Sequence, residues 1–353
     1  MIIHLSPPHQ HGGDSIQASM LSVIFALLPA SLCAVWLFGW LAVWQILTCI
    51  GVCMLSEWVA MRMMKRVSRL HDGSAALTGL LLALILPAAT PWWMSIMGAV
   101  FAIILGKQVY GGLGYNPFNP ALSARVILLI SFPLAMTSWL IPAQAMPAGV
   151  DLYDISTTLA LFFGGPEAMG QTLDAITMAS PLGYVKDDAR QGISVALSLQ
   201  THGYSYLDAF IGKETGSMGE TSALALLIGG IILISRNTIR WHIPVSYLLT
   251  VAVLAAIFNT IDGDRFAPPL FHLLAGGLML CAFFMATDPV SSPMGVKGHV
   301  VFGVGCGVLT WVIRTWGGYP EGAMFAVLLM NCAVPFIDHY FRPRVYGHQR
   351  KTP

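Results

Sequence analysis

The chain has 353 residues, of which 10% are charged and 56% are hydrophobic, and its mean hydropathy is +0.70. Soluble domains carry about 25% charged residues, so this composition excludes an ordinary soluble enzyme, a disordered chain and a basic nucleic-acid-binding protein. A membrane-spanning helix needs about 20 mostly apolar residues. We therefore expect an all-α polytopic membrane protein that is surrounded by lipid and binds no nucleic acid.

The apolar runs, taken in chain order, predict about ten transmembrane helices in two groups of five. They lie at residues 20–38, 41–62, 74–90, 92–110, 121–141, 221–236, 243–260, 268–287, 299–316 and 320–338. The sequence thereby divides into 1–19, a first five-span unit 20–142, a polar segment 143–220, a second five-span unit 221–340 and a basic tail 341–353. The first residues lack the pattern of a cleaved signal peptide, so none is expected.

The distribution of charge predicts an orientation. Residues 143–220 contain nine acidic and three basic side chains, which gives −6, and the rest of the chain carries +7. Basic residues follow the even-numbered spans, and lysine and arginine collect on the cytoplasmic side of membranes. These residues are Arg62, Lys65, Arg66, Arg69, Arg236, Arg240, Lys297, Arg342, Arg344, Arg350 and Lys351. We expect both termini in the cytoplasm and the 143–220 segment as a large external loop.

The two five-span units resemble each other. Residues 77–91 and 274–293 are both glycine-containing apolar runs that end in a segment broken by proline, and 111–133 and 317–335 both run from Gly-Gly through Tyr and Pro into an apolar run. Because five spans is an odd number, the two repeats must cross the membrane in opposite directions. Inverted repeats with broken helices place polar backbone near the membrane midplane, where a ligand or an ion is held.

Several polar residues within the apolar runs are candidate functional groups. Asn116 and Asn119 each precede a proline, which breaks regular helix, so this segment is either a tight turn or a re-entrant segment lining a pocket. Glu57 and Asp288 are acids in or beside spans and are either helix-end anchors or candidates for an ion path. No cysteine spacing supports a zinc site or a Cys-ligated cluster, so no metal is expected.

A hydroxyl-containing segment stands out in the external loop. Residues 172–182 read TLDAITMASPL, with Asp174, Thr177 and Ser180 ahead of Pro181. From the residues alone, this segment is an ordinary turn with a helix cap.

The chain resembles the D subunit of the Rnf electron-transport complex and, more distantly, the B subunit of the sodium-pumping NADH:quinone reductase. The resemblance runs from about residue 17 to residue 349 and includes GKQVYGGLGYNPFNPA, IRWHIP, ATDPV, GGYPEG and RPRVYGH. It implies an inverted-repeat membrane fold and a place in a bacterial inner-membrane complex with subunits A, B, C, E and G. That complex couples electron transfer between ferredoxin and NAD to the movement of Na⁺ or H⁺.

The resemblance also implies a covalent flavin. The family attaches FMN through its phosphate to the last hydroxyl of a motif D-G-x-S/T-x-A-T-P-L, and a flavin transferase does so on the external, periplasmic side. Here the motif includes Asp174, Thr177, Ala179, Pro181 and Leu182, and the acceptor position is occupied by Ser180. Ser180 retains the oxygen that a phosphoester needs, and the loss of one methyl changes selection by only about 1–3 kcal/mol.

Relatives also imply a second, non-covalent flavin, riboflavin, which we place near the Asn116–Pro120 turn and the 287–293 break. The expected function is an electron-relay and ion-coupling subunit that is not active alone. Two alternatives stay open: an inverted-repeat solute or ion channel without flavin, and a structural Rnf subunit whose flavin site has decayed.

Overall fold

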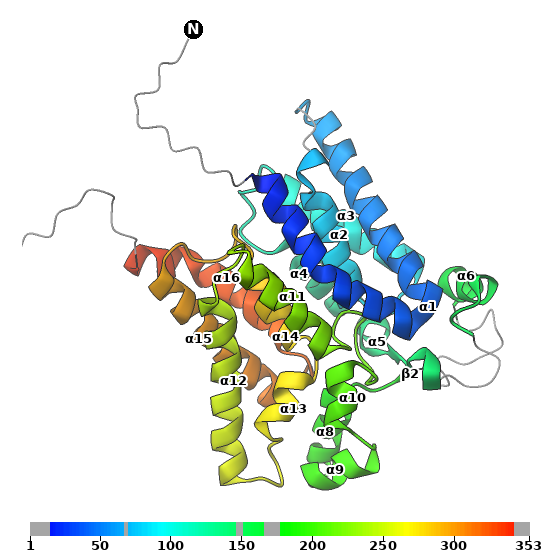
Figure 1. The fold of residues 1–353 in the computed structure, drawn as a ribbon, viewed down its shortest axis with the longest axis vertical. Coiled ribbons are helices and arrows are strands. Elements are labelled where there is room, and N and C mark those ends of the chain that lie inside the picture. Colours follow the sequence, from blue (N-terminus) through cyan, green and yellow to red (C-terminus); the bar gives the residue numbers. More distant parts are fainter. Residues whose placement is uncertain (1–14, 67–69, 146–150, 166–176, 342–353) are drawn as a thin grey trace, which may run out of the picture.

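The computed structural model describes residues 15–66, 70–145, 151–165 and 177–341, and these residues are mostly helical (Figure 1). The helices are α1 (Ile16–Met63), α2 (Ser74–Ile85), α3 (Trp92–Ile103), α4 (Pro120–Ser131), α5 (Pro133–Thr137), α6 (Ile155–Gly164), α8 (Pro181–Arg190), α9 (Val195–Thr201), α10 (Tyr206–Ile211), α11 (Ala223–Ser235), α12 (His242–Ile261), α13 (Pro269–Leu274), α14 (Leu278–Leu280), α15 (Val296–Trp316) and α16 (Ala323–Tyr340). Two π-helical segments, η2 (Ile104–Gln108) and η5 (Cys281–Met285), continue α3 and α14. Short 3₁₀ turns lie at η1 (Leu70–Asp72) and η3 (Ala143–Ala145). The expected all-α membrane architecture is confirmed.

Four of these helices, α1, α12, α15 and α16, are long and apolar enough to cross a membrane. The 48-residue α1 corresponds to the first two predicted spans, because Gly39 interrupts it with φ 58° and ψ −142°. Only glycine adopts this backbone conformation readily. It leads directly into Trp40, whose amide donates a hydrogen bond to the carbonyl of Leu152 at 3.0 Å.

The remaining predicted spans are helical but shorter than expected. The twelve residues of α2 extend about 18 Å, less than the roughly 30 Å of a bilayer core, and the chain leaves the helix just before Pro87. The predicted span 268–287 is divided among α13, α14 and η5, with Gly276 at φ 71° between the first two. Non-helical backbone at membrane depth is tolerated where protein covers it, and α2 is almost wholly buried.

The helices of each predicted repeat pack mainly with one another. In the first repeat, α1 lies against α2 and α3, while in the second α12 and α16 lie on α15. Contacts of α11 with α1, and of α16 with α4, join the two groups. Their shared core includes Leu27, Leu82, Leu122 and Phe302, each fully buried.

The 143–220 segment differs from the irregular loop that its polar composition predicts. Where described, it contains α6, α8, α9, α10 and β2 (Thr177–Met178), and β2 pairs antiparallel with β1 (Trp139–Leu140), which lies just before the segment. Helices α8, α9 and α10 lie together at the bottom of Figure 1, away from the first residues of α1 and the last residues of α16. A small core of their own, including Leu182, Tyr184 and Val195, packs against Phe271 of α13. Serine and aspartate caps begin these helices, which explains why a polar sequence folds here.

Candidate functional site

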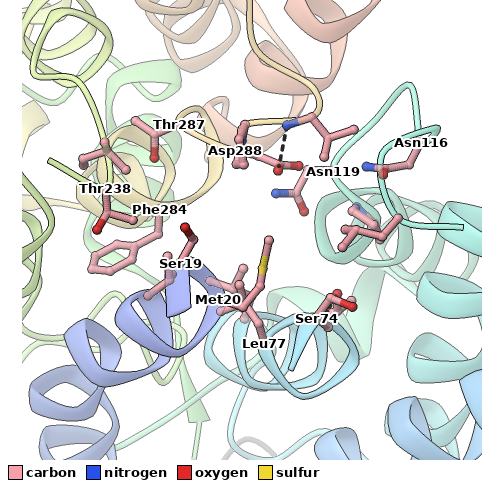
Figure 2. A pocket seen from close by; sticks show the side chains of 18 of the residues that line it. Ser19, Met20, Ser74, Leu77, Asn116, Asn119, Thr238, Phe284, Thr287 and Asp288 are labelled. Atoms are coloured by element: carbon pink, nitrogen blue, oxygen red, sulfur yellow. Dashed lines mark hydrogen bonds between the residues drawn. The ribbon is translucent and has the colours of Figure 1, made fainter. Parts of the chain in front are cut away.

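A cavity of about 140 Å³ lies between the two repeats and brings three predicted site residues together. Asn116, Asn119 and Asp288 all line it, and its other polar lining residues include Ser74 and Lys107. Figure 2 shows Asp288 and the two asparagines on one side of the view and Ser74, with Leu77 and Met20, on the other. The broken segment with Asn116 and Asn119 in the first unit and the one with Asp288 in the second unit therefore face one cavity.

The two asparagines have different local roles. Asn119 is the N-cap of α4, and its Oδ1 accepts hydrogen bonds from the amides of Ala121 and Leu122 at 3.1 and 3.3 Å. Asn116 donates through Nδ2 to the carbonyl of Phe118 at 2.9 Å, but its buried Oδ1 has no partner among the described residues. The cap explains Asn119 structurally, whereas Asn116 retains an unpaired acceptor.

Asp288 lies in the turn after η5. Its carboxylate accepts hydrogen bonds from the amide of Val290 at 3.3 Å and from the hydroxyl of Ser291 at 3.1 Å. Among the described residues, no basic side chain lies within the 4.0 Å of an ion pair with it. Asp288 therefore presents a half-buried carboxylate to the cavity without a neutralising partner.

Glu57 has a different environment from Asp288. Its Oε1 lies 2.6 Å from Nζ of Lys107 and accepts a hydrogen bond from Nε2 of Gln108 at 2.8 Å. Lys107 also donates to the hydroxyl of Ser74 at 2.6 Å. Lys107 lines the cavity and Glu57 does not, so Glu57 lies behind the part of the cavity wall that Lys107 forms. The sequence alone does not predict these partners, because nothing in their spacing from Glu57 indicates the contact.

The expected attachment residue, Ser180, is the N-cap of α8. Its Oγ accepts a hydrogen bond from the amide of Gly183 at 3.2 Å, and the side chain is only 4% exposed. The neighbouring residues of the motif have different structural environments. Thr177 lies in β2, the Ala179 carbonyl accepts a hydrogen bond from Thr215, and Leu182 is buried in the small core. Asp174 lies outside the described residues.

Two cavities adjoin Ser180 on either side of the start of α8. One, of about 310 Å³, is also lined by Ala179, Lys186, Arg190 and Tyr319. The other, of about 20 Å³, leads past Pro181 toward buried acidic side chains. No residue lines both a Ser180 cavity and the Asp288 cavity, so the described part of the chain has two separate candidate sites.

The larger Ser180 cavity is lined by the basic Lys186 and Arg190 and by the acidic Asp187, whose Oδ1 lies 3.5 Å from Nη1 of Arg190. The N-terminus of a helix carries partial positive charge and favours phosphate, and Ser180 sits at the N-terminus of the ten-residue α8. Lys186 and Arg190 follow along the same helix. Nζ of Lys186 donates to the carbonyls of Ile313, Arg314 and Tyr319 at 2.9–3.3 Å. Burial, helped by Arg190, lowers the pKa of Lys186 to about 8.

A further group of charged residues is not predictable from the sequence. Arg125, Glu220, Arg314 and Glu321 are each buried. The only sequence signal is a charged residue within or beside an apolar run, which by itself does not show that four such residues meet.

A comparison with known protein families decides the relationship. The model of the NQR2, RnfD, RnfE family matches residues 3–347. The chain belongs to this family. Similar proteins include the D subunits of the ion-translocating oxidoreductase complex in Salmonella paratyphi B, Salmonella typhi and Salmonella arizonae. Each is 44% identical over 354 aligned positions that cover 98% of both chains. Membership of the NQR2, RnfD, RnfE family confirms the resemblance found in the sequence.

Proposed function

We propose that this chain is the D subunit of an Rnf-type complex that couples electron transfer between ferredoxin and NAD to the movement of Na⁺ or H⁺ across the bacterial inner membrane. The family match over nearly the whole chain and the names of its relatives support this assignment. The partners are the other complex subunits, A, B, C, E and G, and the membrane lipid. The chain contributes to an oxidoreductase activity that needs those partners.

The proposal places FMN on Ser180 as a phosphoester, introduced by a flavin transferase on the periplasmic side. The observation that carries this assignment is the position of Ser180 at the start of α8, beside a cavity of about 310 Å³ lined by Lys186 and Arg190. The bound flavin would supply electron transfer in one- and two-electron steps. The chain's own residues bind its phosphate and exclude water from the attachment residue, which is 4% exposed.

The cavity between the repeats is the second candidate site. It is mostly apolar, and Asn116, Lys107 and Asp288 place polar groups along it. A flat heterocycle with amide-like edges, such as riboflavin, needs this combination of apolar walls and few hydrogen-bonding groups, in a site of about 300 Å³ or more. The cavity of about 140 Å³ would therefore have to widen to enclose riboflavin. Asp288 is also the better of the two ion-path candidates, since Glu57 is neutralised by Lys107.

The test is the chemical state of the peptide around residues 165–190. The chain is expressed with a flavin transferase, denatured and separated on a gel, and the band is inspected for flavin fluorescence and digested for mass spectrometry. We expect a mass addition of FMN less water on Ser180 and its loss in Ser180→Ala. Thr177→Val serves as the matched control, because it removes the other hydroxyl of the motif and leaves the expected acceptor.

Two results would overturn parts of the proposal. An addition on Thr177 that survives Ser180→Ala would keep the redox function and move the attachment site. A dark band with an unmodified peptide would favour the two alternatives: a channel of inverted-repeat design, or a structural subunit whose flavin site has decayed. Co-purification of the other subunits would then distinguish these two, since only the structural subunit requires them.

A further inference from the structure

Four charged side chains meet in the interior beneath Ser180. Arg125 belongs to α4 and Arg314 to α15, while Glu220 precedes α11 and Glu321 precedes α16. Their exposed fractions are 1%, 4%, 4% and 8%, respectively. Burying an ionised group costs several kcal/mol unless hydrogen bonds and opposite charges compensate for it. The contacts of each group therefore determine its charge state.

The two arginines direct their hydrogen bonds to backbone. Arg125 donates to the carbonyl of Met136 at 3.1 Å and contacts its sulfur at 2.8 Å. Arg314 donates to the carbonyls of His272 and Ala275 at 2.7 and 2.9 Å. Within the described part of the chain, neither arginine forms an ion pair with Glu220 or Glu321. The guanidinium groups thus contribute positive potential to the carboxyl groups but no donor.

The carboxyl groups of Glu220 and Glu321 line the same cavity. Both oxygens of Glu220 and Oε1 of Glu321 are buried and have no hydrogen-bond partner among the described residues. This shared cavity of about 20 Å³ places the two side chains close together. An ionised carboxylate only accepts hydrogen bonds, whereas a protonated one also donates. Two adjacent carboxyl groups therefore satisfy each other when they hold a single proton between them.

The helix break shapes the space for this pair. A Cβ atom added at Gly277 would lie 2.5 Å from Oε1 of Glu220, so the absence of a side chain there makes room for the carboxyl group. The neighbouring Gly276 has φ 71° and separates α13 from α14. The break between these helices thus accommodates Glu220 at a depth where a continuous helix with side chains would exclude it.

A small cavity connects the pair with the proposed attachment residue. Its volume of about 20 Å³ is enough for one water molecule. Glu220, Glu321 and Ser180 all line it, together with Tyr204 and Glu214. Glu214 accepts a hydrogen bond from the amide of Ser205 and so differs from the unpartnered Glu220. A water in this cavity would reach from the carboxyl pair toward the start of α8.

We propose that Glu220 and Glu321 form a carboxyl pair that holds one proton in a shared hydrogen bond and exchanges it through the water-sized cavity beside Ser180. The exchange is an acid–base equilibrium: two carboxylates and one proton from water form the singly charged pair, with no electron transferred. With both arginines charged, the four side chains then carry a net charge of +1. That positive charge would stabilise an anionic group on Ser180, the one element of this inference that rests on the proposed function.

The proton equilibrium is influenced by every ionisable or hydroxyl group that faces the pair. On the cavity lining these groups are Ser180, Tyr204, Glu214, Thr215 and Thr221, and Arg125, Arg314, Ser217 and Cys281 also act on the pair. The two arginines favour ionisation of both carboxyl groups, whereas burial and the mutual repulsion of the carboxylates oppose it. The Ser217 hydroxyl, which also faces Glu220, favours its ionised form. Both oxygens of Glu220 nevertheless lack a hydrogen bond of normal geometry among the described residues, and a proton held between the two carboxyl groups supplies a donor that a doubly ionised pair lacks.

The test is infrared spectroscopy of the full chain within its purified complex, prepared with and without the flavin transferase. A protonated carboxyl group has a C=O stretching band above the carboxylate bands, which moves to lower frequency in D₂O. We expect such a band at neutral pH in both preparations, and its loss in Glu220→Gln and in Glu321→Gln. Glu214→Gln is the matched control, since it removes another carboxyl group from the same cavity and should leave the band unchanged.

The outcomes separate the pair from the flavin. A band that persists in both glutamine variants would assign it to another carboxyl group and overturn the inference. Absence of the band in the unaltered protein, at pH values where its complex is intact, would also overturn it. Loss of the band on adding Na⁺ would show that the pair ligates a cation instead of holding a proton. Because the flavin-free preparation is included, an unmodified Ser180 would refute the attachment proposal without affecting this test.

Discussion

The buried Glu57–Lys107 ion pair provides a sharp test of how charge is accommodated behind the cavity between the repeats. The side chains are 3% and 2% exposed, and the separation of Oε1 and Nζ is 2.6 Å. In the variant Glu57→Gln, the side chain keeps its shape and an oxygen that can accept a hydrogen bond, but it loses the negative charge. Lys107 would then be a buried cation whose remaining partners, including Ser74, are neutral.

The expected loss of stability follows from leaving one charge uncompensated. Removing one partner of a buried ion pair typically costs about 3–5 kcal/mol. The retained hydrogen bonds of Lys107 place Glu57→Gln toward the lower end, at about 3 kcal/mol. The double variant Glu57→Gln, Lys107→Met removes both charges, and we expect it to be at least about 1 kcal/mol more stable than Glu57→Gln alone.

The assay is unfolding of the purified protein in detergent by titration with a denaturing detergent, followed by tryptophan fluorescence. Asp208→Asn is the control, because Asp208 and Lys213 form a pair with a 3.9 Å separation and side chains that are 43% and 52% exposed. Such exposed pairs contribute about 0–1 kcal/mol. The reasoning would be refuted if Glu57→Gln and Asp208→Asn had equally small effects. It would also be refuted if the double variant were less stable than both Glu57→Gln alone and Lys107→Met alone.

Three further predictions address the backbone, pH dependence and ion coupling. Gly39→Ala should reduce stability by about 3 kcal/mol or more in the same titration, because residue 39 has φ 58° and an added Cβ would overlap the Leu152 carbonyl. Gly51→Ala is the control, because nothing lies within 4 Å of an added Cβ there. It should be neutral or stabilising by up to about 1 kcal/mol. The pKa of Lys186 is lowered to about 8 from 10.5, so the unfolded chain binds more protons than the folded chain between these two pH values. The stability of the unaltered protein should therefore rise with pH in this range, relative to that of Lys186→Met. A fall in stability would mean that the three carbonyl acceptors stabilise the ammonium group more strongly than burial destabilises it. Asp288→Asn should lower the number of ions taken up per electron in vesicles, whereas Glu57→Gln should lower only the amount of folded complex. An unchanged ratio of ions to electrons in Asp288→Asn would exclude Asp288 from the ion path.

The sequence predicts the two candidate sites unevenly. Asn116, Asn119 and Asp288 are identified from their breaks in apolar runs, and the structure brings all three to one cavity. Ser180 is identified through the resemblance and is also the helix cap that its own local sequence predicts. The partners of these residues are not predictable. Lys107 lies 50 residues from Glu57, and Lys186 is more than 120 residues from the carbonyls that it contacts. No periodic pattern encodes such distant pairings.

Composition and apolar periodicity by themselves determined that this is a helical membrane protein, because a chain with 10% charged residues can bury its surface only in lipid or against itself. They also located the apolar runs of the two five-span units, including the division of α1 at Gly39, but not the short apolar helix α6 within the 143–220 segment. Tertiary packing decided the lengths of those helices and the charge environment inside them. The short helix α2 is tolerated at membrane depth because the rest of the protein buries almost all of its residues. Glu220 and Glu321 come to line one cavity only in the folded chain, since they precede different helices, α11 and α16.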